Sequence, residues 1–177
     1  MEQVLKVNKN EYRIIRLLGK GKGGYSYLAQ YSGKQVVVKQ IHHEPCSYYS
    51  FGNKIEAEKN DCKRLENAGI RIPKMIDIDM ENERIVKEYI DGDTIFEMIV
   101  KGFSVSDYLP QIKEMAALAK ANGLNIDYFP TNFVVQNGVL YYIDYECNDF
   151  MDEWSFENWG VKYWSRSPEF EEYLKNH

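Results

Sequence analysis

Residues 18–28 have the sequence Leu18-Gly19-Lys20-Gly21-Lys22-Gly23-Gly24-Tyr25-Ser26-Tyr27-Leu28, a glycine-rich turn between two apolar runs. Within this turn, Gly19, Gly21 and Gly24 have the GxGxxG spacing, and Gly23 adds a fourth glycine. Glycine lets a backbone approach phosphate oxygens closely and adopt positive φ, so its N–H groups can bind anions. The spacing alone is equally compatible with a flexible hairpin turn.

The residues around the turn distinguish between the glycine-rich loops that bind phosphate. In the dinucleotide-binding fingerprint the glycines open a helix, whereas Tyr25–Leu28 is predicted to be a strand. A Walker loop ends in Gly-Lys-Ser/Thr, but residues 24–26 are glycine, tyrosine and serine. What remains is a strand, a glycine turn and a second strand, an arrangement that covers the phosphates of a bound nucleotide.

The hydrophobic pattern predicts an α+β protein of two lobes. The Asn-Gly pair at residues 137–138 lies between two apolar runs and is the strongest hairpin signal in the chain. Strands are expected at Tyr12–Leu18, Tyr25–Tyr31, Gln35–Ile41, Met75–Asp79, Arg84–Ile90, Phe133–Gln136 and Val139–Asp144, and helices at Phe51–Ala68, Thr94–Val100 and Ser106–Asn122. Gly69 is expected to end the first helix.

Composition narrows the classes of function. A net charge of -5 argues against a broad basic surface and disfavours nucleic acid as a partner. The three scattered cysteines, Cys46, Cys62 and Cys147, predict free thiols in a reducing compartment. No apolar stretch has the length of a membrane span, so a cytoplasmic protein is expected. The adjacent His42 and His43 have no companion ligands and are predicted to lie at the surface.

Lys39 ends the run Val36-Val37-Val38, which is predicted to be a buried strand. An isolated lysine at a strand end commonly extends its ammonium to solvent. The alternative places Lys39 beneath the glycine turn, where it contacts the α- and β-phosphates of a nucleotide and needs a carboxylate to hold it. Glu58 on the following helix is the candidate for that carboxylate, and Glu56 is its competitor.

The segment Asp127-Tyr128-Phe129-Pro130-Thr131-Asn132 and the later Asp144 form the most informative constellation. Asp127 can accept a proton from an attacking hydroxyl, and the amide oxygen of Asn132 can ligate Mg²⁺. Asp144 follows an apolar strand and supplies a second hard oxygen ligand for Mg²⁺. Each residue alone is an ordinary turn or strand-end residue. Their order behind the glycine turn and Lys39 favours phosphoryl transfer.

From Tyr12 to Glu146 the chain resembles the protein-kinase-like superfamily, and it is most similar to the small atypical branch of aminoglycoside and choline phosphotransferases, lipopolysaccharide-core kinases and RIO-like kinases. The resemblance implies a minimal two-lobed kinase-like fold in a single domain, with a lobe of antiparallel sheet plus one helix (1–90) and a reduced, mainly helical lobe with a β-hairpin (91–177). It implies ATP and Mg²⁺ as cofactors, with Asn132 and Asp144 as the metal ligands. The hinge that binds adenine through its backbone then corresponds to Glu88, Tyr89 and Ile90.

Three departures from the family pattern bear on the activity. Asn125 occupies the place of an organising histidine two residues before Asp127, and Lys87 occupies the place of an apolar gatekeeper. Only residues 145–177 follow Asp144, without the Ala-Pro-Glu segment of ordinary protein kinases. The expected activity is transfer of the γ-phosphoryl group of ATP to a hydroxyl, on a small molecule rather than a peptide. A pseudokinase that binds nucleotide or a partner without turnover, and a RIO-like protein kinase, are the alternatives.

The last segment is rich in aromatic residues. Trp154, Trp159 and Trp164 recur at intervals of five, so they do not form one helical stripe. We expect these rings to seal the smaller lobe, and the alternative is that they bind the acceptor.

Overall fold

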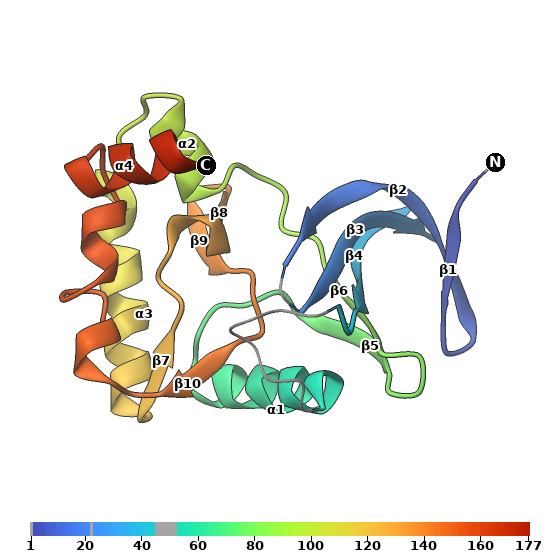
Figure 1. Ribbon diagram of the computed structural model, residues 1–177. Coiled ribbons are helices and arrows are strands. Elements are labelled where there is room, and N and C mark those ends of the chain that lie inside the picture. The colour runs from blue at the N-terminus through green and yellow to red at the C-terminus, as the bar shows by residue number, and fades with distance from the viewer. Residues whose placement is uncertain (1, 22, 45–52) are drawn as a thin grey trace. The chain divides into compact units, whose positions relative to one another are not determined.

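The computed structural model describes residues 2–21, 23–44 and 53–177, so Lys22, Cys46 and the first residues of the predicted helix lie outside the described part. The chain divides into two compact units. The first unit comprises residues 1–60 and 73–89, and the second comprises residues 61–72 and 90–177. A curled antiparallel sheet in the first unit, with several helices elsewhere, confirms the predicted α+β class (Figure 1).

The first unit is built on one six-stranded sheet with the order β1-β2-β3-β4-β6-β5, in which every neighbouring pair is antiparallel. Its strands are β1 (Val4–Val7), β2 (Asn10–Lys20), β3 (Gly24–Tyr31), β4 (Lys34–Ile41), β5 (Met75–Asp79) and β6 (Arg84–Glu88). Ser32 and Gly33 join β3 to β4 in a two-residue turn with positive φ at both positions, which matches the right-handed twist of the strands. The buried cluster of this unit includes Tyr12, Val38 and Val86.

Helix α1 (Lys54–Asn67) ends where the sequence predicts. Gly69 has a φ of +81°, and the backbone N–H of Ile70 donates to the carbonyl of Leu65. A left-handed glycine with bonds back to the last turn is the usual way in which a helix stops.

The second unit contains the second half of α1 and, after residue 90, helix α2 (Ile95–Val100), which Thr94 caps. The Thr94 side chain accepts from the N–H of Glu97, and the Glu97 side chain accepts from the N–H of Thr94, which makes a complete capping box. The unit continues with α3 (Leu109–Ala121), β7 (Leu124–Ile126), the hairpin of β8 (Phe133–Gln136) and β9 (Val139–Tyr142), β10 (Cys147–Asp149) and α4 (Pro168–Asn176). Strands β7 and β10 pair as a separate antiparallel ribbon.

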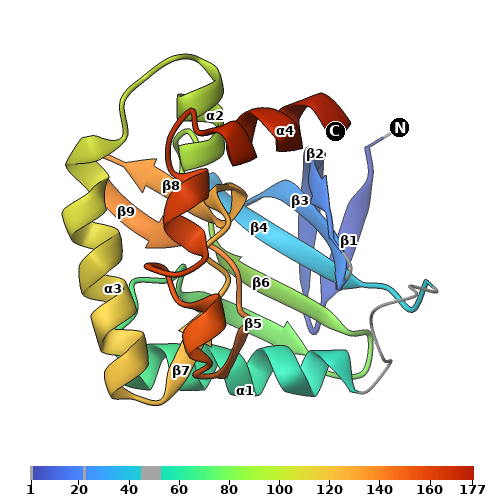
Figure 2. The same cartoon turned by 60° about the vertical axis from the view of Figure 1, so that its left-hand side comes forward.

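Helix α3 lies beside the hairpin and β7 (Figure 2). The side chain of Gln111 on α3 donates to the carbonyl of Gly138 at 3.0 Å and accepts from the N–H of Leu140 at 2.9 Å. This side chain therefore fixes the tip of the hairpin to the helix.

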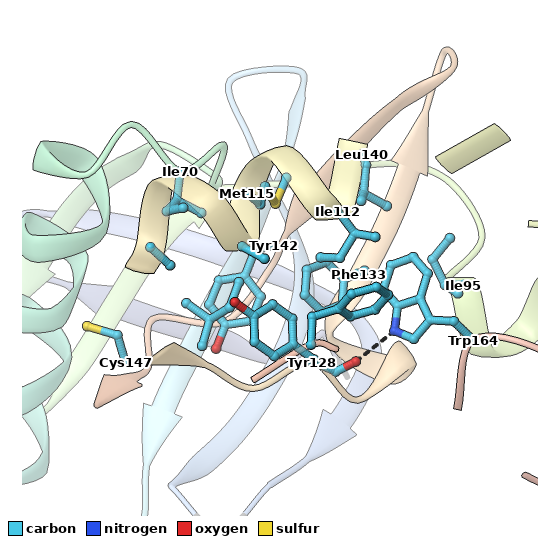
Figure 3. Packing of buried hydrophobic residues seen from close by; sticks show 14 of the residues in the cluster. Ile70, Ile95, Ile112, Met115, Tyr128, Phe133, Leu140, Tyr142, Cys147 and Trp164 are labelled. Carbon is cyan, nitrogen blue, oxygen red and sulfur yellow. Dashed lines mark hydrogen bonds between the residues drawn. The ribbon is translucent and has the colours of Figure 1, made fainter. Parts of the chain in front are cut away.

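The core of the second unit is strongly aromatic. Phe133 packs on Tyr142 with ring centroids 5.2 Å apart, and it packs on Trp164 at the same distance (Figure 3). The indole N–H of Trp164 donates to the carbonyl of Tyr128 at 2.8 Å, so this buried ring has a partner for its polar atom. Trp164 thus seals the core as expected, whereas Trp154 is 49% exposed.

The structure differs from the predicted elements at several boundaries. Strands β1, β7 and β10 were not predicted, β6 ends at Glu88 rather than Ile90, and β9 ends at Tyr142 rather than Asp144. The predicted helix over Ser106–Asn122 starts as a separate 3₁₀ turn, and the α-helix begins beside Pro110. None of the helices in residues 2–21, 23–44 and 53–177 combines the length and the apolar character that a membrane crossing needs.

Candidate active site

The glycine-rich segment from Gly19 to Gly24 is not all turn, because its first and last glycines belong to strands. Gly19 belongs to β2, where it pairs with Ser26, and Gly24 begins β3. A Cβ on Gly24 would lie 2.5 Å from the backbone carbonyl oxygen of Gln40, so Gly24 is required by the close approach of β4. A Cβ on Gly19 would meet nothing within 4 Å. The glycines therefore have different roles, and at Gly24 the role is in the sheet.

Gly23 lies directly against the predicted lysine–glutamate pair. A Cβ at this residue would be 3.6 Å from Nζ of Lys39 and 3.7 Å from Oε1 of Glu58. The ammonium of Lys39 donates to Glu58 in a short ion pair, with side-chain exposures of 12% and 13%. Glu58, not its competitor Glu56, is the partner of Lys39. Three residues predicted for phosphate binding thus meet at one place in the first unit.

His42 holds the glycine turn and is not the surface residue that the sequence predicts. Its side chain is 10% exposed, and its Nε2–H donates to the carbonyl of Gly21 at 2.8 Å. Its backbone N–H donates to the carbonyl of Gly23 at 3.3 Å. Two carbonyls of the turn are therefore bound by one residue at the end of β4. The pairing of Gly24 with Ile41 places His42 there, and the sequence gives no local signal for that register.

The predicted hinge lies where the chain leaves the first unit. Glu88 is the last residue of β6, and the boundary between the two units falls between Tyr89 and Ile90. The backbone N–H of Glu88 donates to the carbonyl of Lys74 at 2.9 Å, so this amide is already used within the first unit. Lys87, at the gatekeeper position, is 7% exposed and lies opposite Val37 of β4.

In the second unit, the segment from Asp127 to Asn132 folds back on itself. Oδ1 of Asp127 accepts from the N–H of Phe129 at 3.1 Å, and the side-chain amide of Asn132 donates to the carbonyl of Asp127 at 3.3 Å. Pro130 starts the 3₁₀ turn that returns the chain to Asn132. Because the NH₂ of Asn132 points at Asp127, the oxygen of the amide is the end that a cation would meet.

Asp144 follows β9, the strand of the hairpin that pairs with β8. Phe133 pairs with Tyr142, and the N–H of Ile143 donates to the carbonyl of Asn132 at 2.9 Å. Asn132 thus lies opposite Ile143 at the open end of the hairpin, and Asp144 is the next residue along the chain. An amide oxygen and a carboxylate are the hard ligands that Mg²⁺ takes alongside water and phosphate oxygens. A cluster of three or more His, Cys, Asp or Glu suited to a metal is not found in the part of the chain that the structure describes.

Tyr142 is a further residue of this site that the sequence did not identify. Its hydroxyl accepts from the N–H of Asp127 at 3.3 Å and donates to the carbonyl of Glu146 at 2.7 Å. Complete burial raises the pKa of Tyr142 well above its ordinary value, and the carboxylate of Asp144 acts in the same direction. A buried tyrosine needs a partner for its hydroxyl, but the sequence does not distinguish Tyr142 from Tyr141.

Asn125 lies in the β7–β10 ribbon, opposite Asn148. It is 6% exposed, and its side-chain nitrogen donates to the carbonyl of Met151 at 3.4 Å. Its Oδ1 is a buried polar atom without a hydrogen-bond partner among the described residues. Asn125 therefore contacts Asn148 of the ribbon and Met151 after it.

Comparison with known proteins gives partial similarities. The chain is 27% identical over 94 residues to the KEOPS complex subunit Bud32 of Pyrococcus abyssi (strain GE5 / Orsay), which covers 51% of this chain and 42% of Bud32. It is 32% identical over 104 residues to the serine/threonine-protein kinase PknA of Nostoc sp. (strain PCC 7120 / SAG 25.82 / UTEX 2576), which covers 54% of this chain and 18% of PknA. No family model matches the chain.

These matches span less than half the length of either relative. Over about half of its length the chain is thus similar to part of Bud32 and to part of a serine/threonine-protein kinase. These similarities do not favour the small phosphotransferase branch over the others.

Proposed function

We propose that the chain is an ATP- and Mg²⁺-dependent phosphotransferase that moves the γ-phosphoryl group of ATP to a hydroxyl of a small molecule. The observation that supports the proposal is that the side chain of Asn132 donates to the carbonyl of Asp127, while the carbonyl of Asn132 accepts from the N–H of Ile143, the residue before Asp144. Distant similarity to a serine/threonine-protein kinase supports the same class of reaction.

The second unit would hold the metal and the acceptor. The side-chain oxygens of Asn132 and Asp144 are proposed to ligate Mg²⁺, which when bound bridges phosphate oxygens and offsets their charge. Asp127 is exposed, with Oδ1 bound by the N–H of Phe129. This carboxylate is proposed to orient the acceptor hydroxyl and to take its proton as the new P–O bond forms.

The first unit would hold the nucleotide. Lys39, kept in place by Glu58, is proposed to contact the α- and β-phosphates, and the turn containing Gly21 and Gly23 is proposed to cover them. The backbone of Glu88, Tyr89 and Ile90 is proposed as the adenine hinge, with Ile90 favoured over Glu88 as the donor because the Glu88 amide is bound by Lys74. The proposal requires both groups to act on one nucleotide.

A small-molecule acceptor is favoured by how the residues after Asp144 are used. Tyr145, Cys147, Phe156, Trp164 and Phe170 are all buried, with exposures of 4% or less. This segment therefore packs the core of its own unit and does not form a separate platform for an extended peptide. The second candidate is a protein acceptor, as in a RIO-like kinase, because PknA is named a serine/threonine-protein kinase.

The test is consumption of ATP by the wild type, Asp144→Ala and Asp127→Ala, each with and without Mg²⁺. We expect Mg²⁺-dependent turnover that Asp144→Ala removes and that Asp127→Ala lowers by at least about a hundredfold. Panels of sugars, aminoglycosides and choline-like alcohols are compared with protein acceptors and with autophosphorylation. Equal rates in the wild type and Asp144→Ala across all panels, with nucleotide binding intact, would favour the pseudokinase alternative.

A further inference from the structure

Tyr142 lies between the two segments that carry the acidic residues of the second unit. Its ring is fully buried in β9 and packs on Phe133 (Figure 3). Its hydroxyl contacts the backbone N–H of Asp127 and the backbone carbonyl of Glu146. One oxygen atom therefore joins the residue that opens the Asp127–Asn132 segment to the residue two positions after Asp144.

Strand pairing on both sides of Tyr142 fixes the backbone to which its hydroxyl bonds, at Asp127 and at Glu146. The pairing of Phe133 with Tyr142 fixes one side of the segment, and the pairing of Ile126 with Cys147 fixes the other. Asp127 and Glu146 are the next residues inward from that second pair. At this end of the β7–β10 ladder, the hydroxyl of Tyr142 accepts from the N–H of Asp127 and donates to the carbonyl of Glu146. Both hydrogen-bonding roles of the buried hydroxyl are therefore used.

The position that the family resemblance assigns to an organising histidine does not make this link. The side chain of Asn125 donates to Met151, away from Asp144 in the sequence. The Asn125 bond and the β7–β10 pairing join the two segments farther along the ribbon, whereas the hydroxyl of Tyr142 bonds to Asp127 and Glu146 themselves.

We infer that Tyr142 is a positioning residue whose hydroxyl holds Asp127 in register with Asp144 for phosphoryl transfer. This inference rests on the proposed function. It predicts an effect on turnover that exceeds the effect on nucleotide binding, because both hydrogen bonds of the Tyr142 hydroxyl are with residues of the second unit, whereas the glycine turn and Lys39 belong to the first. Misplacement of a reacting group by about 1 Å can lower a rate by about a hundredfold.

The experiment compares Tyr142→Phe with Tyr141→Phe. Both remove one hydroxyl from the same strand, but Tyr141 is half-buried and its ring lies beside the Arg71 guanidinium at 5.9 Å. We expect Tyr142→Phe to lower kcat by about ten- to a hundredfold, with KM for ATP within about twofold of the wild type. Tyr141→Phe should leave both constants unchanged. Replacement of Tyr142 by 4-aminophenylalanine, which keeps a donor at the same place, should restore part of kcat.

Amide hydrogen exchange supplies a readout that does not need turnover. In Tyr142→Phe the N–H groups of Asp127 and Phe129 should exchange faster, while those of Val134 and Val135 in β8 keep their protection. Unchanged kcat, unchanged exchange at Asp127, or loss of protection throughout the second unit would each overturn the inference. If the wild type turns over no more ATP than Asp144→Ala, the proposed function fails, and exchange at Asp127 then decides whether the hydroxyl holds that residue.

Discussion

The side-chain nitrogen of Asn132 lies 3.3 Å from the backbone carbonyl oxygen of Asp127, and this bond leaves the amide oxygen as the end that the proposed Mg²⁺ would meet. A carboxylate at this position would keep an oxygen ligand but would lose the donor to Asp127. The amide therefore has two separable tasks, and substitutions can test them one at a time.

We predict that Asn132→Ala raises the Mg²⁺ concentration for half-maximal ATP turnover by at least about tenfold, because one of two protein ligands is lost. Asn132→Asp should raise it less and lower kcat instead. Titration of ATP consumption with Mg²⁺ measures both effects. Asn148→Ala removes an exposed amide from β10 of the same unit and serves as the control. An Asn132→Ala protein with the Mg²⁺ requirement of the wild type would contradict the metal assignment.

The pair formed by Lys39 and Glu58 should behave as one unit. Lys39→Ala is expected to weaken ATP binding at least about tenfold, and Glu58→Gln to weaken it less, because the Lys39 ammonium remains near the turn. Calorimetric titration with nucleotide measures both. The double variant should lose less than the sum of the two single effects, with a coupling of about 0.5–3 kcal/mol. Glu56→Gln, on the same helix, is the control, and additive losses would count against the pairing.

Gly24 and Gly19 should respond differently to the same methyl group. Gly24→Ala brings a Cβ to 2.5 Å from the carbonyl oxygen of Gln40, a sheet backbone atom that cannot move easily. The free energy of unfolding should fall by about 1–3 kcal/mol. Gly19→Ala meets no atom within 4 Å, so its stability should stay within about 0.5 kcal/mol of the wild type. Urea denaturation of both variants checks the difference, and equal losses would contradict the account of Gly24.

Alkaline pH should destabilise the protein through Cys147. Burial raises the pKa of this thiol from its ordinary value of 9.0 to about 12, and the Asp61 carboxylate adds to the shift. Between these values the folded protein keeps a proton that the unfolded chain loses. The free energy of unfolding therefore falls as pH rises above about 9, by about 1.4 kcal/mol per pH unit for one group. Burial also raises the pKa of Tyr128, which acts in the same direction.

Urea denaturation between pH 7 and pH 10.5 measures the slope. Cys147→Ala is expected to be less stable at pH 7, because a buried side chain is shortened, but its stability should decline less steeply with pH. The comparison uses slopes, so the loss at pH 7 does not affect it. An identical slope in the wild type and the variant would show that another group controls the alkaline transition.

Local patterns predicted the α+β class and the elements that have strong local signals. The Asn-Gly turn at residues 137–138, the cap at Thr94 and the stop at Gly69 all depend on residues close in sequence, and each is present. The missed strands lack such signals. Strands β7 and β10 have three residues each and pair across some twenty intervening positions, so only the fold of the whole unit brings them together.

In the candidate site too, the residues with local sequence signals were predicted, and those whose contacts depend on the whole fold were not. The order of Lys39, Asp127 and Asp144 is visible in the sequence, and so is Glu58 as the candidate partner of Lys39, an ion pair that the structure contains. His42 and Tyr142 were not identified, because their contacts depend on the register of a strand and on which face of a strand is buried. The tryptophans also differ in burial, because Trp164 lies in the core while Trp154 is exposed. Their five-residue spacing does not indicate which ring is buried.

The hairpin of β8 and β9 has its proposed metal ligands at one end and its exposed turn at the other. Its open end carries Asn132 and Asp144, and its closed end, at Asn137 and Gly138, is exposed and lies about 17 Å from Asn132 along the strand. Because strand pairing sets the spacing of the two ligands, extra residues at the closed end would leave that spacing unchanged. An affinity tag or a fluorescent reporter inserted at the tip would therefore leave the two proposed ligands in place, and would affect instead the bonds that Gln111 makes to Gly138 and Leu140.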